Sequence, residues 1–254
     1  MNGKSKTVEK TLKIIEYLLK SNNPRGISQI SRNLNINKST VQRIINTLNN
    51  ENYLFKDPDN KKYKLGFKFL EISKTILSGI DLRKIAHPYL KELRDKTVET
   101  VHLMILDDSM GVYIDSLESP QRTRVVSSIG TRDDLHFSAV GKTILAYLSD
   151  KEIEKIVRAR GLKRMTPKTI TNVYTLKEEL KIIRDRGYSI DDEEGEVGTR
   201  CIGAPIFNHK GKVVASVSIA APCHRLTEEK LNTFLPLLFQ TTTKISVELG
   251  YSSQ

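Results

Sequence analysis

Two short runs of regularly spaced apolar residues lie next to each other near the N-terminus. The first occupies residues 27–36 and the second residues 41–48, with an Asn-rich turn at 35–37. Spacings of three and four residues are typical of amphipathic helices. The apolar positions are Ile27, Ile30, Leu34 and Ile36, then Val41, Ile44, Ile45 and Leu48. Two helices joined by a tight turn indicate a helix-turn-helix, although an ordinary surface pair of helices has the same pattern.

The polar face of the second predicted helix carries side chains suited to nucleic acid. Arg and Gln can each make two hydrogen bonds to the edge of a guanine or an adenine, while Lys, Ser and Thr bind phosphates. This face would hold Lys38, Ser39, Thr40, Gln42, Arg43 and Asn46. The pattern therefore favours a recognition helix that enters the major groove.

The flanking segments extend the motif into a winged helix-turn-helix. Residues 7–20 form an apolar stripe at helical spacing, residues 21–26 contain helix breakers, and Ser28 is the expected N-cap of the next helix. Residues 53–56 and 61–66 are short strand patterns around the turn Asp57-Pro58-Asp59-Asn60. This hairpin would be the wing, and its lysines could contact phosphates or the minor groove. They are Lys56, Lys61, Lys62 and Lys64.

The rest of the chain alternates between helical and strand patterns and contains no repeated βαβ unit. Helices are predicted at residues 67–80, 81–97 (with Pro88 near its front), 139–148, 151–159, 175–185 and 227–249. Strands are predicted at residues 100–106, 110–116, 122–128, 187–191, 199–207 and 213–220. Antiparallel strands covered by helices predict an α+β domain.

Charge is distributed unevenly along the chain. Residues 1–75 contain 15 Lys and Arg against 6 Asp and Glu, whereas the remaining residues contain 26 against 24. The basic segment therefore coincides with the helix-turn-helix, as expected for a partner that is a polyanion. An anionic membrane is an alternative partner, but no apolar run is long enough to span one and the start lacks a signal peptide. With only Cys201 and Cys223, the sequence predicts a cytoplasmic protein.

Two stretches of the second domain could carry chemistry. In residues 130–148, Ser138 can cap a helix whose first amides, from Ala139 and Val140, would suit a carboxylate. Gly141-Lys142-Thr143 resembles the end of a P-loop, but His136 stands where that motif needs glycine, which argues against nucleotide binding. The purely structural interpretation is a capped helix that packs on the sheet and binds no ligand.

The second stretch is the acidic run at residues 191–196. Successive acids usually form a solvated loop, but Asp191 and Cys201 adjoin apolar strands and could point into the sheet. Paired acids could also serve hydrolysis or a metal, yet the five histidines are scattered and none has the spacing of a zinc site. A Cys–His catalytic pair has no support either. We therefore expect no enzyme activity, no metal and no cofactor.

Over nearly its whole length the chain resembles the IclR family of bacterial transcriptional regulators. The resemblance rests on the winged helix-turn-helix, on LHFSAVGKTILAYL at 135–148, on DDEEGEVGTRCIGAPIF at 191–207 and on VVASVSIAAP at 213–222. It implies a DNA-binding domain at residues 1–66, a linker helix at 67–80 and a GAF-like effector and oligomerisation domain at 81–254. It also implies a homodimer or homotetramer that binds a DNA operator and controls catabolic genes.

The resemblance further implies an effector pocket. Its residues would be the helix-start amides of Ala139 and Val140, the carboxylate of Asp191, Cys201 and the hydroxyl of Ser218, while Ala220 replaces a second hydroxyl found in some members. A free acid would be repelled by Asp191, so Asp191 is expected to accept a hydrogen bond from a ligand hydroxyl or enol. This suggests a hydroxylated or keto carboxylic acid, such as a sugar acid.

These interpretations predict a DNA-binding regulator, with repression favoured over activation. DNA contacts are expected from both helices of the motif and from the wing: Ser28, Gln29, Lys38, Ser39, Thr40, Gln42, Arg43, Lys56, Lys61 and Lys62. The competing hypothesis is an enzyme or metabolite-binding module whose basic domain contacts RNA. The basic domain lacks the aromatic stacking platform that RNA-binding modules use.

Overall fold

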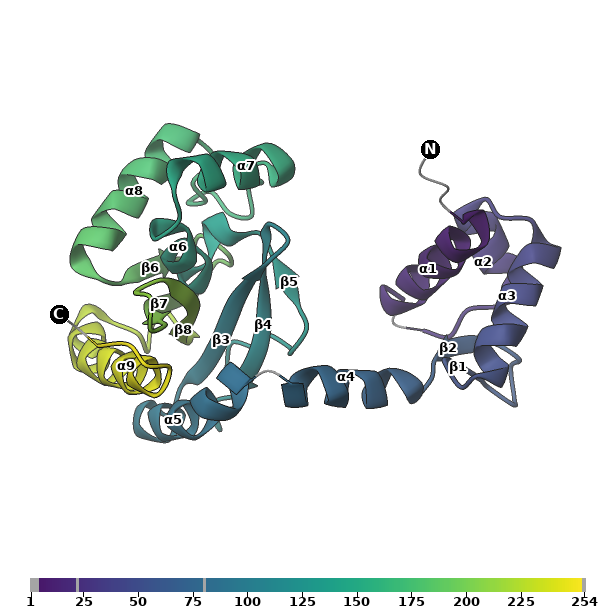
Figure 1. Ribbon diagram of the computed structural model, residues 1–254, viewed down its shortest axis with the longest axis horizontal. Helices are drawn as coiled ribbons and strands as arrows, with labels where there is room; N and C mark the ends of the chain where they lie inside the picture. The colour runs from purple at the N-terminus through teal and green to yellow at the C-terminus, as the bar shows by residue number, and fades with distance from the viewer. Residues whose placement is uncertain (1–4, 22, 80, 253–254) are drawn as a thin grey trace. The chain divides into compact units, whose positions relative to one another are not determined.

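A computed structural model of the chain describes residues 5–21, 23–79 and 81–252 (Figure 1). The chain divides into two compact units, residues 1–79 and 80–254. We call them the N-terminal unit and the C-terminal unit. Each has its own hydrophobic core, as expected of a domain. No helix among the described residues is both long and apolar enough to cross a membrane.

The N-terminal unit is a winged helix-turn-helix. Its elements are α1 (Lys6–Leu19), α2 (Ile27–Leu34), α3 (Lys38–Asn50), β1 (Leu54–Lys56), β2 (Tyr63–Leu65) and α4 (Lys68–Gly79). The apolar positions of α2 and α3 bury Ile30, Val41, Ile44 and Ile45 against Ile14 of α1. Asn35, in the left-handed conformation with φ of 51°, ends α2 and makes the turn sharp.

Two details at the ends of these helices differ from the sequence-based expectation. Ser28 is not the N-cap of α2; Gly26 is, and Ser28 lies inside the first turn. The reason is that Gln29, three residues after Gly26, turns its side chain back and accepts a hydrogen bond from the Gly26 amide at 3.1 Å. The helix expected at 67–80 is observed as α4, and Ile80 lies outside the described residues.

The C-terminal unit is built on one antiparallel sheet with the strand order β5-β4-β3-β8-β7-β6. The strands are β3 (Thr100–Asp107), β4 (Met110–Leu117), β5 (Arg132–Asp133), β6 (Ser189–Asp192), β7 (Thr199–Phe207) and β8 (Val213–Pro222). Its helices are α5 (Asp81–Thr97), η1 (Leu135–Phe137), α6 (Ala139–Ala146), α7 (Asp150–Arg160), α8 (Val173–Arg186) and α9 (Glu228–Glu248). The α+β prediction is confirmed, and α5 continues through Pro88.

The two faces of the sheet differ in polarity. One face presents Val101, Leu103, Val217 and Ile219, with other apolar side chains, to α5 and α9. Helices α6, α7 and α8 lie on the opposite side of the sheet (Figure 1). Because successive side chains of a strand point to opposite faces, the residues between those apolar positions face α6. Along β3 and β8 these include His102 and Ser218, which are direct cross-strand partners.

The start of α6 packs closely on β6 and β7. A Cβ atom on Gly203 of β7 would lie 2.9 Å from the backbone carbon and oxygen of Ala139. On β6, the Ser189 hydroxyl donates to the Ala139 carbonyl at 2.6 Å. Gly203 and Ser189 are themselves paired across β6 and β7. These contacts fix the first turn of α6 above the end of the sheet that carries Asp191 and Cys201.

The strand expected at residues 122–128 is absent. This segment is irregular, and the edge of β4 pairs instead with the two-residue strand β5, where Gly111 faces Asp133. Backbone carbonyls of this segment accept hydrogen bonds from side chains and not from the backbone of a neighbouring strand. Thr100 Oγ1 donates to the Val125 carbonyl at 2.8 Å, and Arg225 Nη2 donates to the Thr123 carbonyl at 2.9 Å. Residues 122–128 therefore form a loop whose backbone is bound by side chains.

Candidate nucleic-acid interface and ligand cavity

The recognition helix α3 begins with a side-chain cap. Asn37 Oδ1 accepts from the Ser39 amide at 3.0 Å and from the Ser39 hydroxyl at 2.8 Å. The Ser39 hydroxyl is therefore already bonded to the cap in the unbound protein. Gln42 donates from Nε2 to Asn46 Oδ1 at 2.8 Å, which holds its amide along the exposed face of the helix. Asn46 thus orients Gln42, a role that the sequence pattern did not distinguish.

Most of the predicted contact residues are exposed. Ser28, Gln29, Lys38, Ser39, Gln42 and Arg43 are exposed, whereas Thr40 is half-buried. Within the described part of the chain, the Arg43 guanidinium has no hydrogen-bond or ion-pair partner. An exposed Arg on the outer face of a recognition helix can reach a guanine edge.

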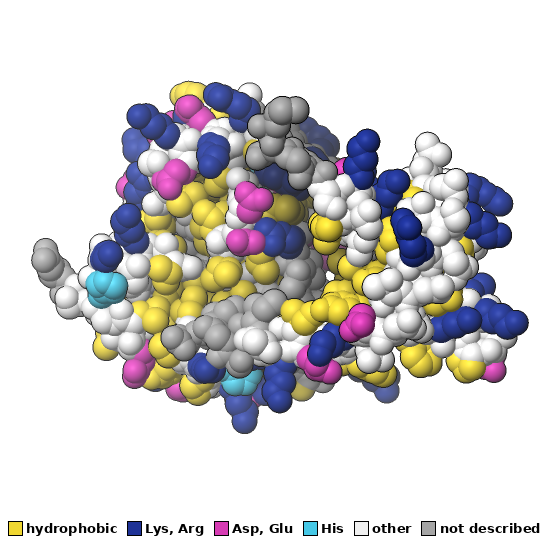
Figure 2. Space-filling view, turned by 45° about the vertical axis from the view of Figure 1, so that its right-hand side comes forward, with side chains coloured by type: hydrophobic (Ala, Val, Ile, Leu, Met, Phe, Trp, Pro, Cys, Tyr) yellow, Lys and Arg dark blue, Asp and Glu magenta, His cyan; other side chains and the backbone are white. Residues whose placement is uncertain are grey.

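The wing presents its own lysines. Lys56, Lys61 and Lys62 are exposed, and the turn between the strands is held by Asp57, whose Oδ1 accepts from the Asp59 amide at 3.0 Å. This backbone hydrogen bond lowers the pKa of Asp57 below its usual value. Figure 2 shows Lys and Arg side chains, in dark blue, over the surface of the N-terminal unit at the right. The unit is therefore suited to a phosphate backbone.

The C-terminal unit contains a cavity of about 230 Å³ between the sheet and the start of α6, lined by both polar and apolar side chains. We call it the ligand cavity. All five residues expected in an effector pocket line it: Ala139, Val140, Asp191, Cys201 and Ser218. They come from α6, β6, β7 and β8, and the pairing of Asp191 with Cys201 across β6 and β7 puts these two on one face. Only Cys201 is partly exposed; the other four are buried.

The start of α6 offers hydrogen-bond donors to the ligand cavity. Ser138 caps the helix as predicted, and its hydroxyl accepts from the Gly141 amide at 3.1 Å. The amides of Ala139 and Val140 precede Gly141, so they have no acceptor inside the helix. Two such amides at the positive end of a helix can bind a carboxylate.

Asp191 faces these donors as a buried carboxylate. Its Oδ1 accepts from the Glu194 amide at 2.7 Å and from the Gly195 amide at 3.3 Å. Burial raises the pKa of Asp191 to about 6, against the opposing effect of those hydrogen bonds and of Lys142. Burial is also the main cause of the pKa of the Cys201 thiol being well above its usual range. Cys201 is therefore a neutral wall of the cavity rather than a nucleophile.

The acidic loop after Asp191 is tied down at several points and is not a freely solvated turn. Lys142 is fully buried in α6 and forms an ion pair with Glu194. The hydroxyl of Thr169 donates to the Glu194 carbonyl at 2.7 Å. Lys168 pairs with Glu193 at 2.8 Å. The loop, whose Gly195 and Glu196 line the ligand cavity, is thus held in place from two directions.

The sequence did not point to the part of the ligand cavity that lies over the central and far strands. It is lined by His102 of β3, Tyr113 of β4, Asp133 of β5 and Ser127, which lies between β4 and β5. Burial lowers the pKa of His102 to about 4 and raises the pKa of Tyr113 and of Asp133. Alternation along β3 assigns His102 to a face, but only the strand order reveals which residues meet it there.

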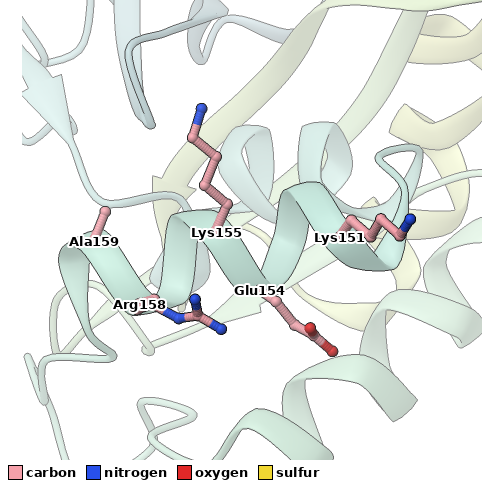
Figure 3. A pocket seen from close by; sticks show the side chains of 5 residues that line it. All are labelled: Lys151, Glu154, Lys155, Arg158 and Ala159. Atoms are coloured by element: carbon pink, nitrogen blue, oxygen red, sulfur yellow. The ribbon is translucent and has the colours of Figure 1, made fainter.

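A second hollow, of about 450 Å³, follows the outer surface of α7. Its lining residues belong to that helix alone: Lys151, Glu154, Lys155, Arg158 and Ala159. Their side chains point in different directions around the helix (Figure 3). Glu154 is already paired with Lys177 at 2.8 Å. No set of groups converges there on one bound molecule, so the ligand cavity is the stronger candidate site.

One group of three possible metal ligands occurs within the described residues. A carboxylate oxygen from each of Asp192 and Glu193 and the Cys223 sulfur lie within 4.8 Å of one another. The Lys168 ammonium lies 3.0 Å from Asp192 and 2.8 Å from Glu193, and Arg200 also pairs with Asp192. These cations already neutralise the acids, which leaves little charge to attract a metal ion.

Two family models match the chain. Residues 74–247 match the model described as bacterial transcriptional regulator IclR C-terminal, and residues 7–58 match the IclR helix-turn-helix domain. Together they cover both units. The first match alone spans more than half of the sequence.

Characterised relatives agree with this assignment. The chain is 36% identical over 226 residues to the HTH-type transcriptional regulator KdgR of Escherichia coli, which covers 89% of this chain and 86% of KdgR. It is 31% identical over 246 residues to the Escherichia coli HTH-type transcriptional repressor AllR, covering 97% and 91% of the two chains. The crystal structure of the Thermotoga maritima IclR superposes with a TM-score of 0.81 at 38% identity, covering 96% of this chain and 99% of that one. These relatives are named as regulators and not as enzymes.

Proposed function

The chain belongs to the IclR family of bacterial transcriptional regulators, and we propose that it represses catabolic genes under the control of a small carboxylic acid. DNA binding by the helix-turn-helix follows from the family. The sign of regulation, the class of effector and the assembly are the proposed parts. The name of the relative AllR, a transcriptional repressor, supports repression.

The observation that carries the proposed effector class is the pairing of helix-start amides with a buried carboxylate in the ligand cavity. The amides of Ala139 and Val140 attract a carboxylate, whereas Asp191 repels one and accepts from a hydroxyl. One ligand satisfies both groups if it carries a carboxylate and, next to it, a hydroxyl or enol. Ser218, which lines the same cavity, adds a hydroxyl that can donate or accept. The proposed effector is a hydroxylated or keto acid, such as a sugar acid.

We also propose that the protein acts as a dimer, or as a pair of dimers. The N-terminal unit exposes large apolar side chains, including Leu12 of α1, Phe67 directly before α4 and Leu70 of α4. Exposed apolar side chains in such number commonly mark a protein–protein contact. A dimer would place two copies of α3 in successive major grooves of a pseudo-palindromic operator.

Control by the effector requires two arrangements of the protein that bind the acid with different affinity. Helix α4 connects the two units along the chain, so a change in the C-terminal unit can alter the spacing of two recognition helices in a dimer. The effect is a coupling free energy between the ligand cavity and the operator.

Isothermal titration with a panel of acids tests the proposed effector class. The panel contains gluconate, glycerate, pyruvate, benzoate and 4-hydroxybenzoate, each titrated into the full chain. We expect heat from at least one of the three non-aromatic acids, which are gluconate, glycerate and pyruvate, and loss of that heat in Asp191→Ala. His209→Gln, an exposed substitution in the β7–β8 turn, is the control and should bind as the wild type does. Heat from the aromatic acids alone would overturn the proposed class.

A further inference from the structure

One buried nitrogen in the wall of the ligand cavity has no partner. His102 is only 3% exposed, and its Nε2 makes no hydrogen bond with any described residue. A buried polar atom without a partner costs folding free energy, and such atoms are uncommon in native proteins. The imidazole packs edge-on against Tyr113, with ring centroids 5.2 Å apart, which fixes its plane beside the cavity. A ligand atom is therefore the missing partner that would compensate for this cost.

The strand order places His102 away from the carboxylate-binding end of the ligand cavity. Asp191 is on β6, at the edge of the sheet, and the start of α6 packs on β6 and β7. His102 is on β3, three interstrand spacings from β6, which is about 14 Å measured along the sheet. The start of α6 lies over Gly203 of β7, whose cross-strand partner Ser218 is also the partner of His102, so about 10 Å along the sheet separates Gly203 from His102. A longer acid bound at the α6 end therefore reaches the imidazole more readily than a two- or three-carbon acid.

The groups around His102 select the chemistry of that far end. Ser218 is its direct partner across β3 and β8 and also lines the cavity. On the other side, Tyr113 of β4 has side-chain hydrogen bonds with Ser127 and Asp133. Hydroxyl and imidazole groups form hydrogen bonds with a hydroxyl or carbonyl oxygen. Apolar side chains, among them Val125, Phe137 and Met165, line the rest of the cavity.

Charge at the far end disfavours a second carboxylate. Burial keeps the His102 imidazole neutral near pH 7, so it offers no positive charge. Asp133 lies close by and would repel an anion whenever it is ionised. Lys142, which lowers the pKa of Asp191, is already paired with Glu194, and neither residue of this pair lines the cavity. The far end thus suits an uncharged polar group.

We infer that His102 is a specificity-determining residue, whose Nε2 donates a hydrogen bond to a hydroxyl or carbonyl oxygen, or accepts one from a hydroxyl, on the part of the effector remote from its carboxylate. This inference rests on the proposed function and narrows it. The effector is an extended, hydroxylated monocarboxylate of about six carbons. Short keto acids, fatty acids of equal length and sugar diacids are excluded as the preferred ligands.

Four probes test this inference by isothermal titration: gluconate, hexanoate, glucarate and pyruvate. Gluconate is the hydroxylated monocarboxylate, hexanoate lacks the hydroxyls, glucarate adds a second carboxylate and pyruvate is too short. We expect wild-type protein to bind gluconate about tenfold or more tightly than hexanoate or glucarate. His102→Leu should lower the gluconate affinity about tenfold and leave the pyruvate affinity unchanged, because an unmade hydrogen bond to a buried group has that order of effect. His102→Gln should recover part of the loss, and His209→Gln should change nothing.

A second measurement needs no variant and so does not depend on how a variant folds. In the wild-type protein, gluconate should move the imidazole ¹⁵N resonance of His102, and hexanoate should leave it in place. An unchanged gluconate affinity in His102→Leu, or an unmoved resonance on gluconate binding, would overturn the inference. Preferential binding of glucarate or pyruvate would overturn it too, with the proposed function intact. Failure of every acid to bind the wild type would overturn the proposed effector class and the inference together.

Discussion

At the scale of single residues, the ligand cavity is costly to the folded protein. Asp191 keeps a carboxylate in a buried site, and His102 keeps a nitrogen without a partner. Both arrangements cost folding free energy, and apolar side chains of similar size would be more stable there. Residues that oppose stability in a cavity are commonly kept for binding. A bound ligand would supply hydrogen bonds to the Asp191 carboxylate and to the His102 nitrogen.

The pH dependence of stability reports on Asp191 directly. Its folded-state pKa of about 6 lies above the value of the unfolded chain, so the folded protein holds the proton more strongly. Its contribution to stability is therefore present at low pH and is lost as the pH rises through about 6. Asp191→Asn removes this loss, and its Oδ1 can still accept from the amides of Glu194 and Gly195. We expect stabilisation of at most about 3 kcal/mol at pH 8 and little change at pH 4.

Urea unfolding of the wild type and Asp191→Asn at pH 4, 6 and 8 checks this expectation. Asp192→Asn is the matched control, because half-buried Asp192 is paired with Lys168 and Arg200 and its pKa is lowered. That variant should gain nothing at high pH. Equal stability of Asp191→Asn and wild type at pH 8 would mean that burial of the ionised Asp191 carboxylate does not destabilise the folded protein.

Arg43 is the residue from which we expect sequence selectivity. If its exposed guanidinium binds a guanine through two hydrogen bonds, Arg43→Ala should weaken operator binding by about 1–3 kcal/mol and leave random duplex DNA much less affected. Fluorescence anisotropy with both duplexes measures the two losses. Thr47→Ala, on the same helix one turn later, is the control. Equal losses on both duplexes would show that Arg43 contacts only phosphates.

At the scale of the elements, regular elements could be predicted from the sequence and irregular ones could not. The three helices, the wing, α6 with its Ser138 cap and the central strands follow from periodicity and capping residues. The segment 122–128 was predicted to be a strand, yet the Thr100 and Arg225 side chains bind its backbone. Those partners lie far away in the sequence. A local pattern cannot reveal them.

The same distinction applies to the site. Capping chemistry at Ser138 and the strand pattern at 199–207 supported the α6 end of the ligand cavity, and the family resemblance supplied the choice of residues. His102, Tyr113 and Asp133 were missed because their convergence depends on the order β5-β4-β3-β8. One histidine in an apolar strand gives no signal of its own. Strand order is a long-range property that one sequence does not state.

The close contact between β7 and the start of α6 predicts that Gly203 cannot be enlarged. In Gly203→Ala, the new methyl group would lie 2.9 Å from the Ala139 backbone and from the Ser189 hydroxyl. We expect a loss of about 1–3 kcal/mol in stability, because overpacking a tight core has this cost. The α6 amides would also shift, so gluconate should bind more weakly. Thermal unfolding and titration check both effects; an unchanged Tm with unchanged binding would contradict the contact.

The wing predicts a change in salt dependence. Lys61 is exposed beside the hairpin turn, where a phosphate contact would be independent of sequence. Lys61→Ala should weaken binding to every duplex alike and reduce the slope of log K against log salt by about 1. Lys151→Ala, on α7 of the C-terminal unit, is the control and should leave the slope as it is. If the slope of log K against log salt is unchanged in Lys61→Ala, the wing does not contact the DNA phosphates through Lys61.

At the scale of the whole molecule, the chain separates two binding tasks. Most of the excess positive charge and the recognition helix belong to the N-terminal unit, and the ligand cavity belongs to the C-terminal unit. Separate cores let each unit keep its own binding surface. If the acid changes operator affinity by some factor, the operator must change acid affinity by the same factor. This reciprocity is a property of the complete chain.

The most direct test of the account is operator binding in the presence of the acid. Fluorescence anisotropy would follow duplex DNA from upstream of the gene across a salt series, with gluconate, pyruvate or no acid. The account predicts tight, sequence-selective binding that weakens steeply with salt and that a hydroxylated or keto acid abolishes or strengthens. Weak binding, equal for every duplex and indifferent to every acid, would contradict it.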